Sequence, residues 1–61
     1  MQIKTLLIRF DSTQEIQIID YFTNEIQFDG QIKDIPLLIL NTTASIDRLE
    51  IHDNKLFIYM I

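Results

Sequence analysis

The sequence contains no cysteine, and glycine, proline and histidine occur only once each among its 61 residues. Without cysteine the chain can form no disulfide and can offer zinc no thiolate ligand. A single glycine excludes the glycine-rich loops that cradle phosphates, and a single histidine, His52, excludes the paired-histidine zinc motif. We therefore expect no catalytic residue, no metal site and no cofactor, and we do not expect an enzyme.

Long apolar runs are also absent. The longest, Ile35–Leu40 and Leu56–Ile61, have six residues, whereas a membrane-spanning helix needs about 20. The first ten residues are interrupted by Lys4 and Arg9 and do not resemble a secretion signal. The sequence thus predicts a soluble, cytoplasmic protein without a membrane contact.

Isoleucine is what the sequence has in abundance: thirteen residues, with no valine. Its branched side chain favours strands. We predict one domain, residues 1–61, that is all-β or a β-rich α+β fold: a small antiparallel sheet, or a partly open barrel, of five to six strands built from hairpins. The isoleucine excess also suggests an AT-rich gene, such as that of a bacterium, a phage or another mobile element.

The last sixteen residues give the clearest pattern, a hairpin that turns at Asp53-Asn54. Both residues tolerate the positive φ angles that a two-residue hairpin turn requires. The register that pairs His52 with Lys55 places one largely apolar face opposite a mixed one. It predicts these further pairs: Ile51 with Leu56, Leu49 with Ile58, Asp47 with Met60, Glu50 with Phe57, Arg48 with Tyr59 and Ile46 with Ile61.

A second hairpin is predicted around Gly30, with Phe28-Asp29-Gly30 as a three-residue loop and Gly30 in a left-handed conformation. This loop pairs Ile26 with Ile32 and Glu25 with Lys33. Leu37–Leu40, beyond Pro36, is predicted to be a short buried strand.

The first third of the chain is ambiguous. Ile3–Phe10 is predicted as a strand. The residues after it fit either a strand over Glu15–Phe22, folded back on the first, or a helix over about 13–23 packed on a four- to five-stranded antiparallel sheet. Ser12 and Glu15 could cap that helix, but the many isoleucine, tyrosine, phenylalanine and threonine residues favour the strand.

Two features suit binding. The net charge is −4, and the span from Phe10 to Ile32 holds five acids and no Lys or Arg. The last strand carries aromatic residues on the face opposite its core side, beside an arginine, a composition typical of interfaces. The candidate protein interface comprises Asp11, Glu15, Asp20, Glu25, Asp29, Arg48, Phe57, Tyr59 and Ile61.

We therefore expect a non-enzymatic protein-binding domain, a small acidic inhibitor or regulator that occludes the surface of a basic or nucleic-acid-binding protein. One alternative is a structural subunit that forms a homo-oligomer through sheet edges or through the aromatic face. A second is a small-barrel single-strand nucleic-acid binder. Its stacking residues would be Tyr21, Phe22, Phe28, Phe57 and Tyr59, but the net negative charge opposes direct contact with nucleic acid or with anionic lipid.

Overall fold

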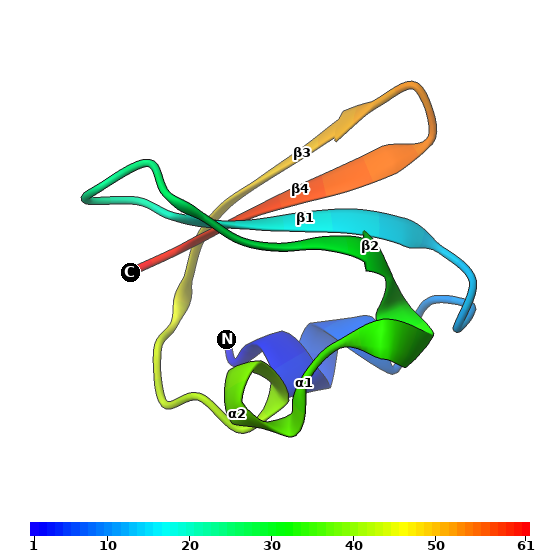
Figure 1. Cartoon of the computed structure of the whole chain (residues 1–61), viewed down its shortest axis with the longest axis horizontal. Coiled ribbons are helices and arrows are strands. Elements are labelled where there is room, and N and C mark those ends of the chain that lie inside the picture. Colours follow the sequence, from blue (N-terminus) through cyan, green and yellow to red (C-terminus); the bar gives the residue numbers. More distant parts are fainter.

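The structure, a computed structural model, describes all 61 residues as one four-stranded sheet with short helices on one side (Figure 1). The elements are α1 (Ile3–Leu7), β1 (Glu15–Asp20), β2 (Ile26–Gln31), the 3-10 turn η1 (Ile32–Asp34), α2 (Leu37–Leu40), β3 (Ile46–His52) and β4 (Lys55–Met60). None of these helices has the length and apolar character needed to cross a membrane.

The strands lie in the order β2-β1-β4-β3. Two antiparallel hairpins, β1–β2 and β3–β4, are joined by parallel pairing of β1 with β4. The predicted β-rich α+β class is confirmed, but the five to six strands, the purely antiparallel sheet and the barrel are wrong. The sheet is open, with β2 and β3 at its edges, because the residues expected to supply further strands form helices.

The prediction of a strand over Ile3–Phe10 is wrong, since α1 occupies its first half. Ile3, Leu6 and Leu7 are buried, a spacing of three and four residues that places side chains on one helical face. They pack against the inner face of the sheet, the side covered by the helices in Figure 1. The inner-face residues of this core are Ile16, Ile18, Leu56, Ile58 and Met60.

The next segment is a strand, which confirms the favoured interpretation for Glu15–Asp20 and rules out the helix over 13–23. The predicted last two residues of that strand, Tyr21 and Phe22, lie in the turn that follows. Its partners differ from the prediction: β1 pairs with β2 and β4 rather than with the first ten residues. Ile16 and Ile18 face the core, while Ile19 is also buried but lies outside the core cluster. A strand with apolar residues on both faces suits a central position in a sheet.

The β1–β2 turn falls at residues 21–25, not at the predicted Phe28-Asp29-Gly30 loop, so the pairs Ile26–Ile32 and Glu25–Lys33 are also wrong. The Oδ1 atom of Asp20 accepts hydrogen bonds from the backbone N–H groups of Phe22 (2.8 Å) and Thr23 (3.1 Å). Asn24 has a φ of 61°, a conformation that asparagine tolerates well. This capped turn leaves Gly30 inside β2.

Leu37–Leu40 forms one helical turn instead of the predicted buried strand. Pro36 precedes it, and proline commonly stands at a helix start because its φ is already helical. Leu37 and Leu38 are 72% and 89% exposed, so half of this apolar run does not enter the core.

The C-terminal hairpin is confirmed over most of its length. Its turn residues Asp53 and Asn54 have φ angles of 50° and 64°, and all pairs from His52–Lys55 to Arg48–Tyr59 are as predicted. A register shift between Ile46 and Arg48 makes Asp47 an extra residue, so the predicted Asp47–Met60 and Ile46–Ile61 pairs are wrong. Ile46 faces Met60, and the backbones of Ser45 and Ile61 exchange two hydrogen bonds.

Candidate protein-binding face

Polar and aromatic side chains gather on the sheet face opposite the helices, here called the outer face. Strand alternation sends to it every second residue of each strand, and the intervening residues of β1 and β4 pack in the core. Its central residues are Gln17 and Ile19 from β1, Asp29 from β2, Arg48, Glu50 and His52 from β3, and Lys55, Phe57 and Tyr59 from β4.

An arginine–aromatic pair lies at one end of the hairpin on this face. Arg48 and Tyr59 are register partners, and the Arg48 Cζ stands 4.3 Å from the centre of the Tyr59 ring. At this distance the guanidinium interacts with the ring electrons. Arg48 Nε also lies 3.1 Å from Glu50 Oε2. The arginine is thus held over the aromatic ring by a carboxylate two residues along its own strand.

Glu50 connects this pair to the hairpin turn. Its Oε1 accepts a hydrogen bond of 3.0 Å from the His52 ring, and the His52 ring stands edge-on to Phe57 with 5.5 Å between centroids. The hydrogen bond from His52, together with the weaker attraction of Arg48, holds the pKa of Glu50 below its ordinary value. Glu50 is therefore ionised at neutral pH, as the ion pair with Arg48 requires.

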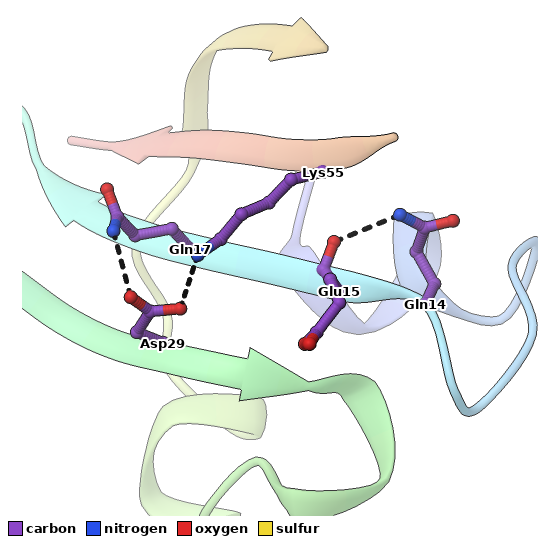
Figure 2. A network of polar contacts seen from close by, with 5 residues as sticks. All are labelled: Gln14, Glu15, Gln17, Asp29 and Lys55. Atoms are coloured by element: carbon purple, nitrogen blue, oxygen red, sulfur yellow. Dashed lines mark hydrogen bonds and ion pairs between the residues drawn. The ribbon is translucent and has the colours of Figure 1, made fainter. Parts of the chain in front are cut away.

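A second polar cluster crosses three strands at the other side of the face (Figure 2). Lys55 extends from β4 across β1 to Asp29 on β2, with 2.6 Å between Nζ and Oδ1. Gln17, between them, donates a 3.1 Å hydrogen bond to the other carboxylate oxygen. These two hydrogen bonds, the one from Lys55 above all, hold the pKa of Asp29 below its ordinary value.

A buried hydrophobic side chain lies beside the aromatic residues of this face. Ile19 is 7% exposed although it lies on the side away from the helices. Its register neighbours are Tyr59 on β4 and Ile26 on β2. Tyr59 therefore has an apolar neighbour on the sheet and Arg48 against its ring, and its own side chain remains half-buried.

The structure brings together five of the nine residues of the candidate interface and separates the others. Glu15, Asp29, Arg48, Phe57 and Tyr59 share the outer face. Ile61 follows β4 and is 47% exposed. Asp11 lies in the loop before β1, Glu25 lies at the β1–β2 turn, and Asp20 caps that turn. The acidic span does not form one continuous face.

Five central residues of the outer face are absent from the interface predicted from the sequence: Gln17, Ile19, Glu50, His52 and Lys55. The hairpin register already placed Glu50 beside Arg48 and His52 opposite Lys55, so that signal was available. The position of Gln17 on this face and the reach of Lys55 to Asp29 depend on the parallel pairing of β1 with β4, which no local pattern in the sequence marks.

A pocket of about 420 Å³ opens on the helix side of the molecule, between the sheet and α2. Ile18 and Met60 contribute apolar lining, and Asp20, Gln27 and Thr42 contribute polar groups. The Asp20 carboxylate already caps the β1–β2 turn. No group of three or more His, Cys, Asp or Glu residues is arranged to hold a metal ion.

The five aromatic residues considered for base stacking are also divided. Phe28 packs against the core, Tyr21 and Phe22 contact each other edge-on in the β1–β2 turn, and only Phe57 and Tyr59 lie on the outer face. They provide no continuous row for successive bases.

Comparisons with known proteins add no assignment. No protein-family model matches the chain, no curated protein matches it, and no solved structure matches it.

Proposed function

We propose that this chain is a non-enzymatic protein-binding domain, a small acidic inhibitor or regulator that covers the surface of another protein with the outer face of its sheet. The observation that carries the proposal is the Arg48–Tyr59 pair and its neighbour Phe57 on a face that no helix covers. We expect it to act in the cytoplasm.

The chemistry of the face supports this function. Tyrosine, phenylalanine and arginine are enriched at the centres of protein interfaces, where they supply much of the binding energy. Here the arginine is already oriented by Glu50 and by the ring beneath it. Binding therefore loses less side-chain entropy than it would with a free arginine.

The distribution of charge indicates a basic partner. The two basic residues of the face are each paired with an acid on the same face, Arg48 with Glu50 and Lys55 with Asp29. The net charge of −4 therefore resides in unpaired acids around the face and elsewhere on the surface. Such a charge attracts a basic surface at long range and makes association sensitive to salt.

The test is affinity enrichment from a lysate of the encoding organism, with purified chains as competitors. We expect a basic protein to be retained by the immobilised domain and released by excess free wild-type chain, but not by excess Tyr59→Thr or Arg48→Ala. Threonine keeps strand propensity at position 59. Leu38→Ala, on the exposed side of α2, is the matched surface control and should compete like wild type.

Circular dichroism of each competitor is the control that the variant is folded. If Tyr59→Thr and Arg48→Ala compete as well as Leu38→Ala does, the outer face is not the binding surface and the proposal is wrong. Raising the salt concentration supplies an independent check, because a complex with a basic partner should weaken.

A further inference from the structure

Strand β3 is an edge strand with features that suit pairing with another strand. It has seven residues and pairs only with β4. On its inner side Leu49 is 42% exposed and Ile51 is 68% exposed, beyond the cover of the helices. An unpaired edge flanked by apolar side chains is a template for strand addition.

The hairpin geometry defines which backbone groups are free. In a two-residue hairpin the residues flanking the turn, here His52 and Lys55, bond to each other, and bonding alternates along the strand. The backbone groups of Leu49 and Ile51 therefore point away from β4. At the far end the Ile46 N–H is already bonded to the Met1 carbonyl, at 2.9 Å. The free edge accordingly runs from Asp47 to the turn.

Charge selects the register of a second β3 strand on this edge. An antiparallel strand related by a two-fold axis through Leu49 places Arg48 opposite Glu50 of the second copy, and Glu50 opposite its Arg48. Opposite charges facing each other across strands are favourable. Moving the axis by one residue brings like charges together, Arg48 against Arg48 or Glu50 against Glu50. Moving it to Ile51 sets Glu50 opposite His52 and Arg48 opposite the turn residue Asn54, so both Arg48–Glu50 pairs are lost.

We propose that two copies of the chain form a symmetric dimer by antiparallel pairing of their β3 strands about Leu49. This pairing joins two four-stranded sheets into one continuous sheet, in which Leu49 faces Leu49 of the second copy and Ile51 lies opposite Asp47 of that copy. The outer faces of the two copies then lie side by side. The dimer does not depend on the proposed partner protein, and either proposal can fail without the other.

The test is sedimentation equilibrium of the purified chain from about 10 µM to about 1 mM, a range that spans ordinary dimer affinities. Wild type should show twice the 7.3 kDa of one chain at the upper concentrations. Arg48→Glu and Glu50→Arg should each dimerise at least about tenfold more weakly, because each puts two like-charge pairs across the axis.

The two variants act as each other's control. Mixed together, Arg48→Glu and Glu50→Arg present opposite charges at both contacts, so the mixture should recover the dimer mass that each variant alone lacks. The double variant Arg48→Glu/Glu50→Arg should dimerise by itself. Leu49→Lys, which sets two ammonium groups against each other at the axis, should be monomeric while its circular dichroism stays that of wild type.

A wild-type chain that stays monomeric at the highest concentration overturns the proposal. So does a dimer that survives Leu49→Lys or that is unchanged in Arg48→Glu, since its contact then lies elsewhere. Failure of the mixed variants to recover the dimer, when wild type dimerises, overturns the Leu49 register.

Discussion

The N-terminal helix offers the sharpest test of the fold, because helix and strand require different burial at neighbouring positions. In α1 the adjacent residues Leu6 and Leu7 are 8% and 4% exposed, while Ile8 is 77% exposed. A strand would send Leu6 and Leu7 to opposite faces. We therefore predict that Leu6→Ala and Leu7→Ala both destabilise the protein and that Ile8→Ala does not.

The size of the effect follows from burial. Removing a buried leucine side chain down to alanine costs about 2 to 5 kcal/mol. The whole domain has a stability of about 3 to 9 kcal/mol by the usual range per residue, so either change removes a large share of it. An exposed substitution such as Ile8→Ala should stay within about 0.5 kcal/mol. Ile3→Val, at a position with no exposure, is a milder core change that should cost about 0.5 to 1.5 kcal/mol.

Urea unfolding followed by circular dichroism measures these differences as shifts of the midpoint at constant slope. We expect Leu6→Ala and Leu7→Ala to be partly unfolded even without urea, Ile3→Val to have a lowered midpoint and Ile8→Ala to match wild type. A large loss in Ile8→Ala together with a normal midpoint for Leu6→Ala or Leu7→Ala would refute the docked helix.

Three further predictions concern single contacts. Because the pKa of Asp29 is lowered by the hydrogen bond from Lys55, its contribution to stability is complete above the ordinary aspartate value of 3.8 and is lost as the pH falls through its lower folded value. The melting temperature of the wild-type protein should fall between about pH 6 and about pH 2.5, and that of Asp29→Asn should fall by less. An equal fall in both proteins would contradict this. Gly30→Ala should lower the free energy of unfolding by about 1 to 2 kcal/mol, because the φ of Gly30 is 158° and an added Cβ would stand 3.2 Å from the Phe28 ring. An unchanged midpoint in urea unfolding would count against this. Asn54→Gly should stabilise the hairpin by about 0.5 to 1 kcal/mol, because Asp-Gly suits the positive φ angles of this turn better than Asp-Asn does, and a lower midpoint would show that the Asn54 side chain has a role beyond the turn.

The parts of the fold that local patterns control were predictable from the sequence. The hairpin of β3 and β4 has a turn dipeptide, Asp53-Asn54, and a register that only one pairing satisfies. The Asp47 bulge was not predictable, because no glycine or proline marks it. Beyond the bulge, at the end of the sheet, Ser45 and Ile61 pair through two backbone hydrogen bonds.

The parts controlled by tertiary contacts were not predictable from local patterns. Gly30 resembled a hairpin turn residue, yet the turn is made by Asp20 and Asn24, whose capping and positive φ close the chain earlier. The isoleucine and leucine residues of Ile3–Phe10 resembled a strand by their branching. The spacing of three and four residues at Ile3, Leu6 and Leu7 was the signal for a helix. The packing of this helix on the sheet outweighs the weak helix propensity of isoleucine.

The candidate face was partly predictable for the same reason. Arg48, Phe57 and Tyr59 followed directly from the hairpin register, and the structure places them together. The positions of the acidic residues of the predicted interface could not be predicted, because the closeness of Asp11 to Asp29 in the sequence does not say which face of a strand each side chain occupies. The Asp20 carboxylate is oriented by the turn that it caps, and the charge of Asp29 is paired with Lys55.

The central claim, that the outer face is a protein-binding surface, is tested most directly by site-specific photo-crosslinking in the encoding organism. A photoreactive phenylalanine analogue at Phe57 reports on the face, and the same analogue at Leu38 reports on the exposed helix side. We expect one discrete crosslinked product with a basic protein from position 57 and none from position 38. The product from position 57 should be lost when Tyr59 is also changed to threonine. Crosslinks from position 38 with none from position 57 would contradict it.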